Sequence, residues 1–548
     1  MPRDVLVFLP PSPEPPRTEA PALVAMAARE LAVPAERLGA VRLQRLSFDA
    51  RPRHRCWRLA LTVWFCDEAP PPPIRTVPPV LPRATPSAPH VVVVGSGPAG
   101  LFCALDCAAA GLRVTIVERG RDVRTRRRAI AAIHRGQAID PDSNYCFGEG
   151  GAGTYSDGKL YTRAGRREEV RGVLEMLVAH GAPEDVLASW RPHVGSNRLP
   201  RVVTAIRETL CAAGVTVRFA TRAEALVRDG NGIAGVAVRR LDDAQIERIA
   251  CDALVLATGH SARDSLAMAA RAGARLEPKG FALGLRIEHP QAWLDAQQYG
   301  GLRDACALPR AFYELATEVE GRGVYSFCMC PGGFIVPAST ASDRVVVNGM
   351  SLRRRDSPFA NAGIVVQLDP DDWCGVRGSA WGWERLVGPL PQRPGDDPLF
   401  GVRVQEALET LAARRGGGGN RAPAQRADAF VEGRGRTPPP LRASYRPGVV
   451  ACDLAEVLVP GLTERLRRGV LAFAERLPGF AGSEGQLVAV ETRTSSPVRI
   501  ARDPETRASR EVPGLYPCGE GAGYAGGIVS AALDGRRTAA ALVARLAA

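Results

Sequence analysis

The stretch HVVVVGSGPAGLFCALDCAAAGLRVTIVERG, residues 90–120, decides the main fold of this chain. VVVV is typical of a buried parallel strand, and the Ala-rich segment after it is typical of a helix. Gly95 permits a tight turn, Gly97 lets a phosphate approach the backbone, and Gly100 lets the helix pack close to the strand. A second strand ends at Glu118, whose carboxylate can accept hydrogen bonds from a ribose. The order of these parts predicts a dinucleotide-binding β-α-β unit.

We expect the glycine turn and the end of the second strand to contact the dinucleotide. The residues concerned are Gly95, Ser96, Gly97, Pro98, Ala99, Gly100, Glu118 and Arg119. The N-terminus of the helix offers free N–H groups and a partial positive charge to the phosphates. This unit by itself does not distinguish FAD from NAD.

Two later segments, together with this unit, resemble the glutathione-reductase-type FAD fold. Residues 251–264, CDALVLATGHSARD, are predicted to form a buried strand that ends in an Ala-Thr-Gly turn. Residues 514–546 are predicted to form a short strand, an acidic turn and a long helix. The resemblance implies that Glu520, where many relatives have aspartate, binds the ribitol chain, and that the last helix points its N-terminus at the flavin pyrimidine. The cofactor residues that it implies are Thr258, Gly259, Gly519, Glu520, Gly526, Gly527 and Ile528.

Five blocks extend this resemblance to a bacterial family of FAD-dependent dehydrogenases whose substrate is unassigned. They are FGEGGAGTYSDGKL, SFCMCPGG, VNGMSLRRRD, ETRTSSPVRI and GLYPCGEGAGYAGGIVSAA, and the likeness covers most of residues 40–548. It implies non-covalent FAD and redox chemistry, with hydride transfer at flavin N5. It does not imply a named reaction.

The Gly-rich segment 144–163 carries aromatic side chains, unlike a flexible linker. In related flavoproteins a loop at this place lies along the ribitol and the isoalloxazine. The cofactor contacts implied here are Gly150, Gly151 and Gly153. Lys159, one of two lysines in the chain, would place a cation near the flavin N1–C2=O edge, where charge develops on reduction. The alternative is a structural loop with this lysine in solvent. The catalytic candidates are Lys159, Ser156 and Asp157.

Polar residues of two further blocks are candidates for the substrate pocket. Residues 347–356 follow an apolar strand. Residues 491–500 hold Glu491, Arg493 and Ser495 at every second position, which on a strand would share one face. The alternatives are a turn with solvated arginines in the first block and an inter-domain polar network in the second. The pocket candidates are Asn348, Ser351, Arg355, Arg493 and Ser495.

The predicted fold class is α/β. A Rossmann-like FAD-binding domain, made of a parallel sheet and a β-meander, is interrupted by an inserted α+β substrate domain and preceded by a small α+β domain. The predicted boundaries are residues 1–68 for the small N-terminal domain, 69–89 for a Pro-rich linker, 90–265 and 500–548 for the FAD-binding domain, and 266–499 for the inserted domain.

The composition predicts the state of the thiols, the compartment of the protein and the absence of a metal site or membrane span. The thirteen cysteines are dispersed without a metal-like C-x-x-C pair, so we expect reduced thiols, a cytoplasmic protein and no metal site. For the close pair Cys328 and Cys330 we expect two buried thiols at a strand end, with a redox-active dithiol as the alternative. The sequence has no run of about 18 apolar residues, so we expect no membrane span. The net charge of +13 comes mostly from scattered arginines, including the cluster Arg126–Arg128, which we expect on solvated faces or in domain contacts.

The predicted function is an FAD-dependent oxidoreductase that acts on an unidentified small molecule. The sequence contains no second strand–GxGxxG–helix unit. This leaves NAD(P)H as a transient donor over the flavin, another electron carrier, or electrons drawn from the substrate itself. One alternative is a flavoprotein that acts on a macromolecule such as RNA, and another is a binding protein with a structural FAD. The basic N-terminal segment that would dock nucleic acid holds Arg51, Arg53, His54, Arg55, Trp57 and Arg58.

Overall fold

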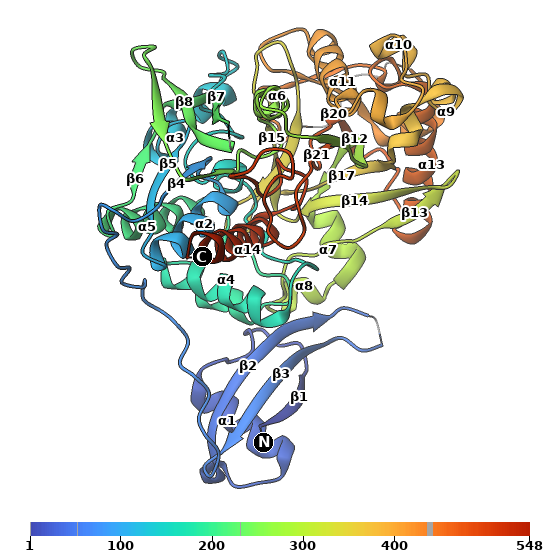
Figure 1. The fold of residues 1–548 in the computed structure, drawn as a ribbon. Helices are drawn as coiled ribbons and strands as arrows, with labels where there is room; N and C mark the ends of the chain where they lie inside the picture. The colour runs from blue at the N-terminus through green and yellow to red at the C-terminus, as the bar shows by residue number, and fades with distance from the viewer. Residues whose placement is uncertain (1, 52, 231, 436–441, 548) are drawn as a thin grey trace.

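The computed structural model describes residues 2–51, 53–230, 232–435 and 442–547 (Figure 1). Its N-terminal part is an antiparallel sheet in the order β1-β3-β2, against which helix α1 packs. Every second side chain of β3 is buried, from Trp57 to Val63, as expected for a strand with one face on a core. The elements are β1 (Arg3–Leu9), α1 (Ala20–Leu31), β2 (Leu38–Asp49) and β3 (Cys56–Phe65).

Strand β2 joins this small domain to the rest of the molecule. The Leu46 N–H donates to the Ala188 carbonyl at 2.7 Å, and the Trp190 N–H donates to the Leu46 carbonyl at 3.0 Å. The ring of Phe48 meets that of Tyr299 edge-on, with centroids 5.8 Å apart. The domain is therefore docked by backbone hydrogen bonds in addition to its covalent connection through the Pro-rich segment.

A five-stranded parallel sheet in the order β22-β10-β4-β5-β6 confirms the predicted parallel sheet. Helices α2, α4, α5 and α14 cover one face, while α6 and the strand β8 cover the other, so the central strands are apolar throughout. The elements are β4 (His90–Val94), α2 (Pro98–Ala109), β5 (Arg113–Val117), α3 (Val123–His134), α4 (Arg167–Ala179), α5 (Leu199–Ala212), β6 (Thr216–Arg218), β10 (Ala253–Leu256), α6 (Arg263–Arg271), β22 (Leu515–Pro517) and α14 (Ile528–Ala547).

The predicted β-meander is present as the antiparallel strands β7 (Thr221–Asp229), β8 (Gly232–Arg240) and β9 (Ile246–Ala250). On the opposite face, α14 packs closely on α2: a Cβ at Gly535 would lie 2.1 Å from the Ala99 carbonyl oxygen. This close packing brings the last helix of the chain against the first helix of the β-α-β unit.

A seven-stranded mixed sheet in the order β13-β14-β17-β12-β20-β18-β19 builds the second large part. All of its neighbours are antiparallel except β18 and β19. Helices α11 and α13 pack on it (Figure 1). Its strands are β12 (Phe281–Pro290), β13 (Ala316–Val319), β14 (Arg322–Cys330), β17 (Phe359–Leu368), β18 (Ala422–Arg426), β19 (Val449–Ala451) and β20 (Gln486–Glu491), and its helices are α7 (Gln291–Tyr299), α8 (Leu302–Ala305), α9 (Gly375–Trp381), α10 (Glu384–Val387), α11 (Phe400–Gly416), α12 (Ala427–Glu432) and α13 (Pro460–Arg476).

Two short strand pairs lie between the large sheets. Strand β11 (Leu276–Pro278), where the chain leaves the parallel sheet, pairs with β21 (Val498–Ile500), where it returns. Strand β15 (Gly333–Pro337) pairs with β16 (Val347–Ser351). Within the described residues, no helix is both long and apolar enough to cross a membrane.

Candidate functional site

A cavity of about 490 Å³, which we call the central cavity, lies where the two large sheets meet. It begins at the glycine turn after β4 and at the meander strand β7, and it passes the loop 145–161. Its lining also includes Phe327 and Cys328 of the second sheet, Asn348 of β16, and the start of α14. A cavity bounded by both large parts of the molecule is a typical place for a ligand site.

The three motif glycines meet different surroundings. A Cβ at Gly95, where φ is +104°, would lie 2.4 Å from the Ala257 carbonyl oxygen, and one at Gly100 would lie 2.0 Å from that of Gly95. A Cβ at Gly97 would meet nothing closer than the Gly151 Cα at 3.9 Å, and Gly97 lines the central cavity. Gly95 and Gly100 are thus required by contacts within the protein itself, whereas Gly97 leaves space on the ligand side.

Two helices begin at this cavity. Gly97 is the N-cap residue of α2, and no side chain caps the free N–H groups there. Gly526 and Gly527, which precede α14, line the cavity and leave open space around their Cα atoms. Uncapped N–H groups and the helix dipole make such starts favourable for phosphate or another anionic group. Ile528, at the start of α14, also lines the cavity.

The structure gives Glu118 a different set of partners from the predicted one. One carboxylate oxygen accepts from the Ser96 N–H and hydroxyl at 3.0 and 2.7 Å, and the other accepts from the Gly120 and Gly148 N–H groups at 2.9 and 3.0 Å. The side chain borders the cavity, but four protein donors already use its acceptor positions. Glu118 therefore ties the glycine turn to the Gly-rich loop. Arg119 stacks over the Phe147 ring, 4.3 Å from its centroid.

The Gly-rich loop lies directly against the glycine turn. The Gly150 N–H donates to the Ser96 carbonyl at 3.0 Å, and a Cβ at Gly151 would lie 3.1 Å from the Gly97 Cα. Gly151 and Gly153 line the central cavity. Gly150 does not, and a Cβ at Gly150 would clash with Thr154 and Val203.

The expectation that Arg126 is solvated is wrong. Its side chain is fully buried under the Gly-rich loop. The guanidinium donates to the carbonyls of Asn144 and Glu149 at 2.8 Å and of Tyr145 at 2.9 Å. One buried guanidinium thus binds several carbonyls of the loop at once. Helical spacing could have indicated it, because residue 126 shares a face of α3 with the buried Ile130.

Two of the catalytic candidates, Asp157 and Lys159, form a polar cluster at the cavity. Asp157 is buried, and its carboxylate lies 3.6 Å from the Lys159 Nζ and 3.1 Å from the Arg355 Nη2. It also accepts a hydrogen bond from the Ser351 hydroxyl. Burial alone would raise the pKa of Asp157, but Lys159 and Arg355 hold it well below its ordinary value. Ser156 binds backbone groups of its own turn, the Gly153 carbonyl and the Gly158 N–H.

Lys159 also contacts the C-x-C pair, which the sequence did not indicate. Its Nζ lies 3.4 Å from the Cys328 Sγ and 3.2 Å from the Cys330 Sγ. Cys330 is fully buried, but Cys328 is only half-buried and lines the central cavity together with Lys159. The expectation of two buried thiols therefore holds for Cys330 and is wrong for Cys328.

The pocket candidates are divided by the structure. Asn348 and Arg493 line the central cavity, whereas Ser351, Arg355 and Ser495 do not. Strand β20 ends at Glu491, so Arg493 and Ser495 do not lie on a strand with it. Beyond this point successive side chains no longer alternate between two faces.

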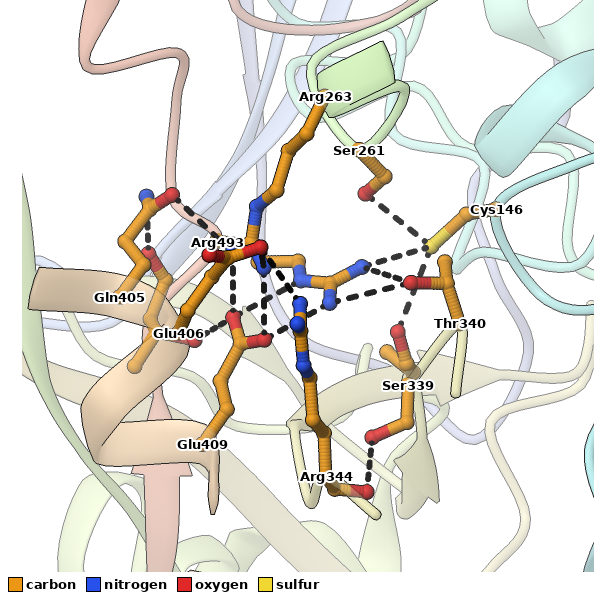
Figure 2. A network of polar contacts seen from close by, with 12 residues as sticks. Cys146, Ser261, Arg263, Ser339, Thr340, Arg344, Gln405, Glu406, Glu409 and Arg493 are labelled. Atoms are coloured by element: carbon orange, nitrogen blue, oxygen red, sulfur yellow. Dashed lines mark hydrogen bonds and ion pairs between the residues drawn. The ribbon is translucent and has the colours of Figure 1, made fainter. Parts of the chain in front are cut away.

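Arg493 belongs to an ion-pair network, which we call the arginine–glutamate clasp (Figure 2). Its guanidinium binds Glu409 of α11 at 2.9 Å, and Arg263 of α6 binds the same carboxylate at 2.8 Å. Glu409 is fully buried. Towards the cavity, Arg493 lies 3.9 Å from the Cys146 Sγ and 3.3 Å from the Thr340 Oγ1. The clasp thus joins α6 of the FAD-binding side to α11 of the second sheet, as the inter-domain alternative predicted.

The Ala-Thr-Gly turn contributes a further pair. Thr258, Gly259 and His260 line the cavity, and the His260 Nδ1 lies 3.3 Å from a carboxylate oxygen of Glu520. His260 lies in the first of the two predicted FAD-binding segments, residues 90–265, and Glu520 lies in the second, residues 500–548. Nothing local in the sequence marks a contact between residues so far apart in the chain.

FAD fits these residues. The cavity is lined by a glycine turn that leaves room on its ligand side, by the uncapped start of α2, by the start of α14 and by members of a polar cluster. Gly97, Gly151, Gly526 and Gly527 would hold the diphosphate and ribitol, and Lys159 would adjoin the flavin. FAD when bound supplies hydride chemistry. Ser96, Gly100, Gly150 and Gly519 do not line the cavity, and they support the turns that do.

Comparisons with known proteins bear on the same regions. A family model described as an FAD binding domain matches residues 90–132 and 161–341. A second, described as a FAD-dependent protein, C-terminal domain-like, matches residues 280–494. An uncharacterized protein of Clostridium beijerinckii is 39% identical over 451 residues, which cover 82% of this chain and 79% of that protein.

Solved structures resemble the chain only loosely. A geranylgeranyl bacteriochlorophyll reductase-like protein of Thermoplasma acidophilum is 13% identical, with 83% of this chain and 77% of that chain covered and a TM-score of 0.35. The E. coli quinol fumarate reductase subunit FrdA is 12% identical, with 85% and 71% covered and a TM-score of 0.34. A Bacillus halodurans glycerol-3-phosphate dehydrogenase complexed with FAD is 13% identical at a TM-score of 0.28; the match covers 52% of this chain and spans 48%, about half, of that chain. No residue role is carried over from them.

The relationship to the Clostridium beijerinckii protein covers most of both chains, and the two family models together span both large sheets. The chain therefore belongs to the family of that protein, as an FAD-binding-domain protein with the C-terminal domain of FAD-dependent proteins.

Proposed function

We propose that the protein is an FAD-dependent oxidoreductase that exchanges a hydride, through flavin N5, with a small molecule held between the two large sheets. The observation that carries the proposal is the course of the central cavity. It leads from the uncapped start of α2 to a cluster that contains Asp157, Lys159 and Cys328. A cofactor site thus opens directly onto titratable and nucleophilic side chains.

The chain's own residues serve this chemistry by charge and position. Lys159 lines the cavity; burial opposes its charge, but Asp157 and the two cysteine sulfurs raise its pKa above the ordinary value. It therefore stays protonated at neutral pH and offers a fixed positive charge to a flavin that becomes anionic on reduction. Asp157, held by Ser351 and Arg355, fixes the ammonium in place.

The experiment that tests this proposal starts from purified full-length protein. Acid precipitation should release FAD, and anaerobic photoreduction should bleach it fully. Reoxidation is then followed against a panel of quinones, disulfides, enones and oxygen, and NADH and NADPH are tested separately as donors by stopped flow. Protein that is colourless and cannot be reconstituted with FAD would refute the proposal.

The alternative of a macromolecular substrate such as RNA receives less support. Recognition of single-stranded RNA needs aromatic rings that are free to stack on bases. Trp57 of the basic N-terminal segment is buried, and its ring packs edge-on against Phe48 at 5.2 Å. Arg51 of that segment is bound to Asp49 at 2.5 Å. A small-molecule substrate is therefore the preferred proposal, with an additional electron carrier as a possible second partner.

A further inference from the structure

One strand presents two sulfurs to a single ammonium group at the end of the central cavity. The Cys328 and Cys330 Sγ atoms both lie within hydrogen-bond range of the Lys159 Nζ, at 3.4 and 3.2 Å. Strand β14 has a β-bulge here, and Cys328 has a φ of +47°, in the left-handed region that a cysteine rarely adopts. Such strained positions persist where the surroundings hold them, and they are concentrated at functional sites.

The charges around the sulfurs do not balance without a thiolate. Three cations meet two buried carboxylates: Asp157 binds Lys159 and Arg355, and Glu491 binds Arg286 at 2.7 Å. Arg286 is itself fully buried and reaches the Cys328 carbonyl at 2.9 Å and the Cys330 Sγ at 4.0 Å. Even with both carboxylates ionised, the cluster holds one more cation than carboxylate, so a thiolate beside Lys159 is electrostatically favoured.

A thiolate at Cys328 supplies the missing charge. The neighbouring Cys330 side chain, followed by Lys159 and Arg286, lowers the pKa of Cys328 against the effect of burial. The Cys330 thiol itself donates to the Cys328 carbonyl at 3.3 Å. The other titratable groups near the cluster stay neutral at pH 7, because burial lowers the pKa of His193 to about 3 and raises that of Tyr313.

We propose that Cys328 and Cys330 are a redox-active dithiol that reduces a small-molecule disulfide in the central cavity, with Cys328 as the attacking thiolate and Cys330 as the resolving thiol. The proposal rests on the proposed function for its source of electrons and adds to it a class of substrate. Cys328 lines the cavity, where a substrate can reach it, and Cys330, two residues further along the chain, is fully buried.

Reduction of a substrate disulfide by this pair of cysteines takes two exchange steps. The Cys328 thiolate attacks one sulfur of R–S–S–R′, so that a Cys328–S–R bond forms, the substrate S–S bond breaks, and R′S⁻ leaves and takes a proton from water. Cys330 loses its proton to water and attacks the Cys328 sulfur, which releases RS⁻. The substrate has gained two electrons and the dithiol has become a disulfide. Bound FAD, once reduced, would supply the two electrons and the one proton that restore the Cys328 thiolate and the Cys330 thiol.

The decisive measurement counts electrons in the full-length holoprotein. The protein is first oxidised with hydroxyethyl disulfide, freed of reagent, and then titrated anaerobically with dithionite. We expect the wild type to take up about four electrons per FAD, two for the flavin and two for the disulfide. Cys330→Ser should take up about two. Cys146→Ser, which alters a cavity cysteine that has no neighbouring thiol among its contacts, should still take up about four. Uptake of two electrons by the wild type would overturn the proposal without any variant.

A second measurement does not depend on FAD. Peptide mass spectrometry follows the alkylation of Cys328 and Cys146 by iodoacetamide between pH 5 and 9. We expect Cys328 to react at least tenfold faster than Cys146 at pH 6, and Lys159→Met to abolish most of this difference. Equal rates for the two cysteines would overturn the thiolate assignment. If the protein reduces its FAD with a donor but shows no reactive Cys328, the dithiol proposal fails while the proposed function stands.

Discussion

The ammonium group of Lys159 lies 3.2 Å from the sulfur of Cys330, a residue 171 positions further along the chain. The same nitrogen lies 3.6 Å from the carboxylate of its near neighbour Asp157. The Gly-rich loop and strand β14 therefore meet in one charged cluster at the cavity. This contact makes Lys159 a link between the predicted flavin loop and the second sheet, and it motivates the first two predictions.

Lys159→Met should lower the two-electron potential of bound FAD. A partly buried charge near the flavin contributes on the order of 1–3 kcal/mol, which corresponds to roughly 20–65 mV. FAD should remain bound, because the glycine turn and the helix starts are unchanged. The potential is measured by dye-coupled reduction. The control is Lys279→Met, which removes the second lysine of the chain, a residue that does not line the cavity. A variant potential within a few millivolts of wild type would mean that Lys159 does not act on the flavin.

Asp157→Asn and Lys159→Met should shift the reactivity of Cys328 in opposite directions. Removing the buried carboxylate leaves Lys159 and Arg355 without their partner, so a thiolate becomes more favourable; removing the ammonium has the reverse effect. The pH profile of Cys328 alkylation should move to lower pH in the first variant and to higher pH in the second. Asp157→Asn should also destabilise the fold by about 3–5 kcal/mol, which urea denaturation measures. Shifts in the same direction would contradict the charge balance inferred for the cluster.

Gly97→Ala should weaken FAD binding and leave the fold intact. The new methyl group would meet no protein atom closer than 3.9 Å, but it would project into the central cavity. We expect the affinity for FAD to fall at least tenfold, about 1.4 kcal/mol, in fluorescence titrations of the apoprotein. Gly395→Ala, at a glycine with open space around it, is the neutral control. Gly100→Ala should destabilise the apoprotein itself, because its Cβ would lie 2.0 Å from the Gly95 carbonyl oxygen. Unchanged FAD affinity in Gly97→Ala would place the diphosphate elsewhere.

Glu409→Gln should cost stability at neutral pH and progressively less in acid. Burial alone would raise the pKa of Glu409, but Arg493 and Arg263 lower it from 4.5 to about 2. A carboxylate with a lowered folded-state pKa stabilises the fold above pH 4.5, and this contribution is lost as the pH falls towards 2. We expect a loss of about 3–5 kcal/mol at pH 7 by urea denaturation, and a smaller difference from wild type below pH 4.

The matched control for the clasp is Glu406→Gln. This neighbour also binds Arg263, at 3.1 Å, but its side chain is 34% exposed. A solvated ion pair contributes up to about 1 kcal/mol, so this variant should change stability far less. Equal effects of the two substitutions would show that burial of Glu409 is not what makes the clasp strong.

The sequence by itself determined the β-α-β unit, the meander and the site of the glycine turn. These features depend on interactions between residues close together in the chain: an apolar strand, three glycines at fixed spacing, a helix and a second strand within residues 90–120. Backbone conformation and hydrophobic period are local properties, so a single sequence expresses them. The same locality limits what the sequence indicates about the second sheet, whose strands pair across long insertions.

Only the tertiary structure decided which charged residues meet. Arg126 reads as one of a run of surface arginines, and it becomes buried because the carbonyls of a loop about twenty residues later need a donor. His260 finds Glu520, Arg493 finds Glu409, and Lys159 finds Cys328 and Cys330. The reason is that the partner of a buried charge is selected by desolvation, which depends on how the whole chain packs. The composition of a local segment carries no record of that packing.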